Sequence, residues 1–124
     1  MSDSIRHLKK DDVLHFIASG AMNTGEHIHM WQYVWRVAHK HNAKRILIEC
    51  ASSCGRISME HCFDLIEKIP LLSRHLACRI ALFEKHMSEE ARELLRFVET
   101  AISDRGAHFK LFDELEEAKL WLKK

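Results

Sequence analysis

The sequence has no long apolar run, no excess of charge of either sign and only one proline. Its uncharged apolar stretches are far shorter than the ~20 residues needed to span a bilayer, so we expect no membrane-spanning segment. Nineteen basic and 18 acidic side chains are interspersed and leave a formal net charge of +1. This balance indicates neither nucleic acid nor an anionic membrane as a partner. A linker, an internal repeat and a low-complexity tract are also missing.

The start of the sequence, MSDSIRHLKKDD, is polar and charged and does not resemble a secretory leader. We therefore expect Cys50, Cys54, Cys62 and Cys78 to be free thiols in a reducing compartment, and the expected location is the cytoplasm. With 124 residues and 47% hydrophobic content, the chain is long enough to bury one continuous core. It is predicted to form a single domain over residues 1–124.

Apolar residues alternate along the chain between a strand-like period of two and a helix-like period near 3.6, which predicts an α/β fold. A β-hairpin is expected from Ser4–Leu8 and Val13–Ala18. Three further strands are predicted at Arg45–Cys50, Cys78–Phe83 and His108–Phe112. Crossovers of this length require mostly parallel pairing and right-handed connections. The expected architecture is a mixed, mostly parallel sheet of four or five strands with helices mainly on one face.

The predicted helices begin near Thr24, Ser58, Ser88 and Asp113. Ser88 has a hydroxyl that can cap its helix, and Gly106 suits a left-handed residue at the end of the same helix. Asp113 and Glu116 have the spacing of a capping box. Pro70 is expected to disturb or end the second helix, because proline lacks a backbone donor and clashes with the preceding turn.

The segment ARELLRFVETAISDRGAHFKLFDELEEAKLWL combines a long amphipathic helix, a short strand and a closing F-x-x-x-E-E-A-x-x-W-L phrase, which runs from Phe112 to Leu122. Together with the strands RILIEC and CRIALF, this pattern resembles the small bacterial STAS/SEC14-type proteins with a SpoIIAA-like fold. The likeness covers essentially the whole chain. It implies a SpoIIAA-like (STAS-like) α/β fold, and it implies binding more readily than catalysis.

Related STAS domains act as anti-sigma-factor antagonists through a phosphorylatable serine in a phrase like D-S-S-G. The corresponding loop here has no preceding aspartate and is interrupted by a cysteine. The loop joins the carboxyl end of a strand to a helix start, where backbone donors and the helix dipole favour an anion. A serine that accepts phosphate, a reactive cysteine and an ordinary loop are the alternatives. The candidate binding or modification residues are Ser52, Ser53, Cys54, Gly55 and Ser58.

Trp31 and Trp35 lie one helical turn apart on the first predicted helix. They are candidates for the lining of a pocket for an apolar ligand, and core packing is the alternative interpretation.

Ten histidines in 124 residues are unusual, and two H-x-H motifs occupy residues 27–29 and 39–41. Residues two apart on a helix point roughly 200° away from each other, so neither motif can chelate a metal from one regular helix. A cluster of Cys50, Cys54 and His61 lacks any recognised metal-ligand spacing. We therefore predict no bound metal and no cofactor, and we interpret the histidines as surface or half-buried packing groups whose charge changes near pH 6.

No arrangement of a base and an oxyanion donor around a serine or cysteine is recognisable, so no catalytic residue is predicted. The leading hypothesis is a non-enzymatic regulatory module that binds an unidentified protein partner through the loop from Ser52 to Ser58. It predicts a filled core and a flat exposed patch. The alternative is a carrier or sensor of a small apolar or anionic, lipid-like ligand, which predicts a cavity beside Trp31 and Trp35. A third hypothesis is thiol or metal chemistry at Cys54.

An exposed strand at the edge of the sheet also predicts a homodimer, because the unpaired groups of an edge strand or an apolar patch need cover.

Overall fold

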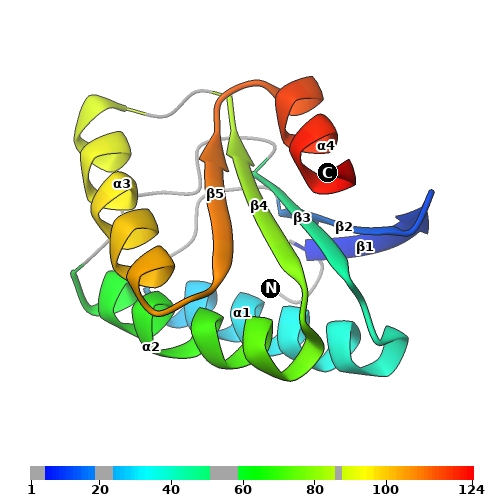
Figure 1. Ribbon diagram of the computed structural model, residues 1–124. Coiled ribbons are helices and arrows are strands. Elements are labelled where there is room, and N and C mark those ends of the chain that lie inside the picture. The colour runs from blue at the N-terminus through cyan, green and yellow to red at the C-terminus, as the bar shows by residue number, and fades with distance from the viewer. Residues whose placement is uncertain (1–4, 19–23, 51–58, 86–87) are drawn as a thin grey trace.

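A computed structural model describes residues 5–18, 24–50, 59–85 and 88–124, with only the backbone for residues 24–28 and 61. Within these ranges the chain forms five strands and four helices, in the predicted order (Figure 1). The elements are β1 (Ile5–Lys10), β2 (Val13–Ala18), α1 (Thr24–His41), β3 (Arg45–Cys50), α2 (Met59–Leu76), β4 (Arg79–Glu84), α3 (Glu89–Asp104), β5 (His108–Phe112) and α4 (Leu115–Lys123).

The strands form one sheet in the order β1-β2-β3-β4-β5. β1 and β2 are antiparallel, and the other three neighbouring pairs are parallel. The prediction of a mixed, mostly parallel sheet is therefore confirmed. In the parallel register, Ala18 lies beside Cys50 and Cys50 lies beside Glu84. The carboxyl ends of β2, β3 and β4 thus meet at one edge of the sheet.

The hairpin between β1 and β2 has a tighter turn than expected. β1 continues to Lys10, and only Asp11 and Asp12 separate it from β2. Both residues have positive φ, 54° and 64°, as a type I′ turn requires at its two central positions. Aspartate tolerates this conformation better than most residues because its short side chain can form local hydrogen bonds. This turn matches the twist of the two strands and fixes their register.

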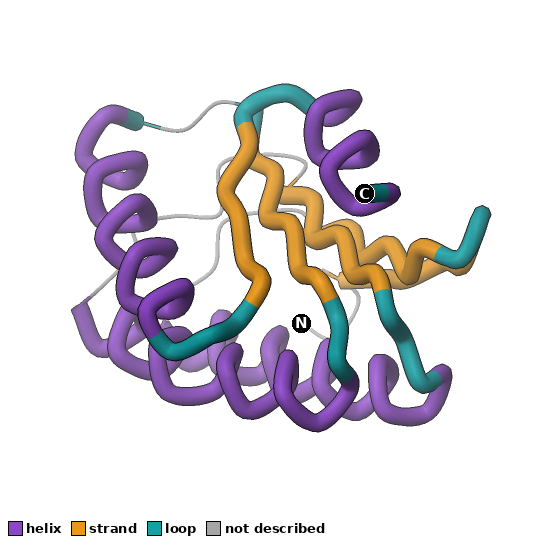
Figure 2. The backbone as a smooth tube through the Cα atoms, viewed as in Figure 1, coloured by secondary structure: helices purple, strands orange, loops and turns teal. Residues whose placement is uncertain are grey.

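Apolar residues from both faces of the sheet are buried, so helices cover both faces (Figure 2). α1, α2 and α3 pack on one face, where they contribute Val34, Leu65 and Leu95 to a large core cluster. α4 packs on the other face, where Ala118 and Leu122 are fully buried. The prediction that helices lie mainly on one face is therefore correct.

α2 continues through Pro70 to Leu76, so the expectation that proline ends this helix is wrong. Pro70 cannot donate a hydrogen bond to the carbonyl one turn earlier. Leu72 and Leu76 lie beyond it, however, and both are buried in the core. Tertiary packing of an apolar face supplies most of the stability of a helix in a folded protein, and here it outweighs one missing hydrogen bond.

The predicted ends of α3 are confirmed. The Ser88 hydroxyl accepts a hydrogen bond from the backbone N–H of Ala91 at 3.1 Å, and Gly106 has a φ of 84°. α3 also reaches the neighbouring edge strand, because Glu99 Oε2 accepts a hydrogen bond from the backbone N–H of Leu111 at 2.6 Å. The side chains of α3 therefore position β5 as well as the core.

The predicted capping box of α4 is wrong. The residue at the N-cap is Glu114, and it makes no side-chain capping hydrogen bond. Asp113 is engaged elsewhere, since its Oδ2 pairs with Arg92 Nη1 of α3 at 3.1 Å. The Asp113 carboxylate therefore forms an ion pair with α3 and does not cap the N-terminus of α4.

Two arginines of the sheet hold the last turn of α4. Arg45 Nε donates to the carbonyl oxygen of Leu122 at 2.7 Å, and Arg79 Nη1 donates to that of Trp121 at 2.8 Å. The Arg79 guanidinium also lies over the Trp121 ring, 5.4 Å from its centroid. The last carbonyls of a helix lack intrahelical partners and carry partial negative charge. Arg45 therefore satisfies the Leu122 carbonyl. Arg79 adds a second donor to the Trp121 carbonyl, which also accepts from the Lys124 N–H at 3.3 Å, and together the two arginines fix α4 to the sheet.

We expect Arg79→Ala to lower the free energy of unfolding by about 1.5–3 kcal/mol, the usual contribution of a partly buried hydrogen bond to a charged group. Urea unfolding followed by circular dichroism would measure the loss. Arg105→Ala is the matched control, because Arg105 also donates to a helix carbonyl, that of Ala101, but on the exposed surface. The control should cost less than about 0.5 kcal/mol. Equal losses in the two variants would contradict the proposed anchoring of α4.

Candidate functional site

The predicted binding or modification loop, with Ser52, Ser53, Cys54, Gly55 and Ser58, lies outside the described residues. It joins the end of β3 to the start of α2, as expected from the sequence.

The described side chains at this edge of the sheet include one buried acid. Glu84 ends β4 and is 9% exposed, and Cys50 beside it is 7% exposed. Burial raises the pKa of the Glu84 carboxyl above its ordinary value, because desolvation disfavours the charged form. The carboxyl end of the sheet therefore holds a group that favours its neutral form more than an exposed glutamate does.

The buried thiols of Cys62, in α2, and of Cys78, just before β4, are not candidates for reactive cysteines. Burial raises the pKa of Cys62, and it raises the pKa of Cys78 to about 11. Because the thiolate is the reactive form, these side chains behave as small apolar groups at neutral pH. Over the described ranges, no group of three or more histidine, cysteine, aspartate or glutamate side chains is arranged to hold a metal ion.

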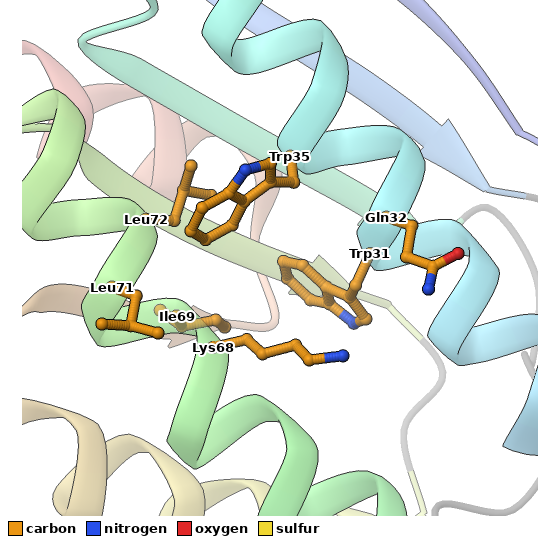
Figure 3. A pocket seen from close by; sticks show the side chains of 7 residues that line it. All are labelled: Trp31, Gln32, Trp35, Lys68, Ile69, Leu71 and Leu72. Carbon is orange, nitrogen blue, oxygen red and sulfur yellow. The ribbon is translucent and has the colours of Figure 1, made fainter.

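A groove with a volume of about 310 Å³ lies between α1 and α2 (Figure 3). Trp31 is only 7% exposed and Leu71, at the rim, is 43% exposed. The groove is thus deep on the tryptophan side and open to solvent at Leu71. Its lining residues are Trp31, Gln32 and Trp35 of α1, and Lys68, Ile69, Leu71 and Leu72 of α2.

The geometry of the groove follows from the helical repeat. Trp31 and Trp35 are one turn apart on α1, and Lys68 and Leu72 are one turn apart on α2, so each pair projects from one face of its helix. The two helices run side by side below the sheet (Figure 1). Both tryptophans that the sequence offered as pocket lining stand on this groove, and Trp31 is part of the core as well.

Among the groove residues, one buried polar atom has no partner within the described part of the chain. Trp31 Nε1 is buried and its N–H donates to none of the described residues. A buried donor without an acceptor costs about 1–3 kcal/mol, so this N–H is an available donor for an oxygen atom that reaches it. Figure 3 shows Nε1 and the Lys68 ammonium at the same end of the groove.

The charge of Lys68 is already paired. Its Nζ lies 3.0 Å from Asp64 Oδ1, one turn earlier on the same helix. The methylene groups of such a side chain pack along apolar surface while the ammonium stays at the edge. The groove therefore presents an apolar surface, and its one lysine does not offer an unpaired positive charge.

Trp35, which lines the groove, also contacts two histidine rings that do not line it. The Trp35 ring lies 5.0 Å from that of His39 and 6.2 Å from that of His75, measured between centroids. His39 and His75 belong to the last turns of α1 and α2. The two helix ends are thus joined by a cluster of three rings.

The structure also contains a pair of side chains that no sequence motif predicts. His15 Nε2 of β2 lies 2.8 Å from Glu49 Oε1 of β3, and both side chains are half-buried. His15 also lines a second cleft, of about 260 Å³, between the hairpin and α4. The alternation along each strand places both residues on the α4 face, but their pairing depends on the register of two strands far apart in sequence.

Comparison with known proteins establishes the fold and leaves the activity open. No protein-family profile matches the sequence, and no curated protein matches it. The fold is similar to that of the protein TM1081, determined by NMR, with a TM-score of 0.66 and 15% sequence identity. The match covers 95% of this chain and 87% of TM1081. The chain is therefore an α/β protein, whose described residues form a five-stranded, mostly parallel sheet and four helices.

Across the described residues, none of the helices combines the length and the hydropathy that crossing a bilayer would require.

The raised pKa of Glu84 predicts a pH-dependent stability. Because the folded protein binds this proton more tightly than the unfolded chain, the ionised form destabilises the fold. The stability contributed by the neutral form is lost as pH rises from the ordinary glutamate range through the higher pKa of the folded state.

We therefore expect Glu84→Gln to be more stable than the parent at pH 7 and to lose this advantage near pH 4. Urea unfolding at several pH values would measure the difference. The exposed Glu117→Gln should show no such pattern. A Glu84→Gln variant that gains stability only at low pH would refute the assignment.

Proposed function

We propose that this chain binds a small apolar, lipid-like molecule in the groove between α1 and α2, as a carrier or sensor. The groove itself is the observation that carries the proposal. The sequence predicts a cavity beside Trp31 and Trp35 for a carrier and a filled core for an interaction module. A groove lined by both tryptophans supports the carrier.

The chemistry of the lining favours an apolar ligand over an anionic one. Covering the exposed apolar surface of Trp35 and Leu71 would remove it from water, which is the main driving force for binding such molecules. A volume of about 310 Å³ is at the lower end of the range of roughly 300–1,000 Å³ for small-molecule sites. An anionic head would meet no unpaired cation, because Lys68 is paired with Asp64.

A single oxygen atom on the ligand is compatible with this site. The Trp31 N–H has no acceptor among the described residues, and a hydroxyl or carbonyl oxygen could accept its hydrogen bond once the groove opens enough to admit it. The best-supported ligand is thus a mainly apolar molecule with at most one uncharged acceptor.

Membership of the STAS/SEC14-type proteins with a SpoIIAA-like fold is part of this proposal. The order of the strands, the antiparallel hairpin at the start and the helix against the second face support it. The carrier hypothesis fits the SEC14-type side of the resemblance. Binding of a protein partner through the loop from Ser52 to Ser58 stays a prediction, since that loop lies outside the described residues.

Native and denaturing mass spectra of the protein, purified from its own host, would test for a resident ligand. A carrier should show extra mass that is lost on denaturation. A bare chain would oppose the carrier, and a covalent gain near 80 Da, the mass of a phosphoryl group, would instead support the serine switch.

We expect Leu71→Lys to weaken binding of the uncharged fluorophore N-phenyl-1-naphthylamine by about tenfold or more, because the variant places an ammonium at the apolar rim of the groove. Fluorescence titration would measure the affinity. Leu120→Lys is the matched control, since Leu120 is also an exposed helical leucine, 63% exposed against 43% for Leu71, but lies on α4. Equal affinities for the two variants would place the binding site elsewhere.

A further inference from the structure

Both histidines of the H-x-H motif at residues 39–41 lie close to a histidine of another element of the fold. The His39 ring lies 6.1 Å from the ring of His75, and the His41 ring lies 5.9 Å from that of His7, measured between centroids. Successive histidines of one motif thus contribute to two separate pairs, each formed with another element of the fold. The proposed ligand groove accounts for neither pair.

We propose that His39 and His75 form a site for a divalent transition-metal ion of the nickel, copper or zinc type, bridging the ends of α1 and α2. Imidazole nitrogen is a preferred ligand of these ions. The two rings would occupy two coordination positions, and water would occupy the rest. This proposal is independent of the ligand groove.

A hydrogen bond sets the tautomer of His39. Its Nδ1 lies 3.2 Å from the carbonyl oxygen of Trp35. A carbonyl oxygen only accepts, so Nδ1 carries the proton and donates. In the neutral ring, Nε2 then keeps its lone pair. Metal-binding histidines commonly donate their second ring nitrogen to a backbone carbonyl in this way, which orients the ring for the ion.

The separation of the two rings is within the reach of one ion. A metal–nitrogen bond of about 2.1 Å places the ion about 3.2 Å from each ring centroid, so two rings that share an ion at a tetrahedral angle lie about 5.2 Å apart, and the His75 ring has to move about 1 Å closer to His39 to reach it. The observed separation is 6.1 Å. His75 makes no hydrogen bond to any described residue, and both side chains are exposed. Its ring is therefore free to turn a nitrogen toward His39 Nε2.

The charges around the pair are mixed. His39 and His75 lie in the last turns of their helices, where the helix dipole places partial negative charge. Lys40 and Arg74 lie in the same turns, and Lys44 Nζ donates to the Leu76 carbonyl oxygen at 2.7 Å, so the two imidazole nitrogens have to supply the affinity.

Among the described residues, the second pair, His7 and His41, has no ring nitrogen whose lone pair is fixed by a hydrogen bond to a carbonyl oxygen. His7 Nδ1 lies 2.5 Å from the Tyr33 hydroxyl, which can donate or accept and so leaves the tautomer of His7 open. This pair provides a comparison within the same protein.

The test is titration of the reduced, full-length protein with nickel chloride, followed by tryptophan fluorescence. Trp35 contacts both rings, so a bound paramagnetic ion should quench it. His39→Ala and His75→Ala should each weaken nickel binding by about tenfold or more, since even outer contacts of a metal site change affinity by this factor. His41→Ala is the matched control and should bind within about twofold of the parent.

Thermal unfolding gives a second readout. Nickel should raise the melting temperature of the parent and of His41→Ala, because an ion that binds only the folded state stabilises it by mass action. It should leave His39→Ala and His75→Ala unchanged. The proposal is overturned if the parent fails to bind, if His75→Ala binds as tightly as the parent, or if His41→Ala loses as much affinity as His75→Ala. Far-UV circular dichroism would verify that these exposed substitutions preserve the fold.

Discussion

Burial of the central strands on both faces is the constraint on which the rest of the structure depends. In β3, Ile46 and Ile48 are buried against α1 and α2, while Leu47 between them is buried on the opposite side. A sheet of this kind is stable only if helices cover both faces. α4, the helix on the second face, is short and has no side-chain hydrogen bond at its N-cap. Arg45 and Arg79 of the sheet hold it in place by donating hydrogen bonds to its last carbonyls.

Local signals in the sequence were enough to predict most of the fold. The β-branched run Arg45–Cys50 and the alternating run His108–Phe112 have the predicted bounds, and Ser88 caps α3 as its hydroxyl suggests. The errors arose where tertiary structure overrides local preference. Buried leucines carry α2 past Pro70, and an ion pair with another helix removes Asp113 from its expected cap.

In the candidate site, too, local sequence signals predicted one part and tertiary contacts determined the rest. The spacing of the two tryptophans indicated one wall of a cavity, because residues four apart share a helix face. The opposite wall comes from α2 and includes Leu71 and Leu72, which lie beyond the proline that was expected to disturb or end this helix. The approach of His39 to His75 was equally hidden, since it depends on two helices that run side by side and end together. The sequence of α1 or of α2 taken alone predicts neither the second wall of the groove nor the approach of the two histidines.

The carboxylate of Glu99 has a consequence for how copies of this protein meet. By accepting the N–H of Leu111, it occupies a backbone donor on the outer side of the last strand, and an added strand there would have to displace a negatively charged group. The opposite border of the sheet carries Lys9 and Lys10, and two such borders would repel each other. These charged groups oppose edge-to-edge pairing of strands, the contact through which exposed edge strands aggregate.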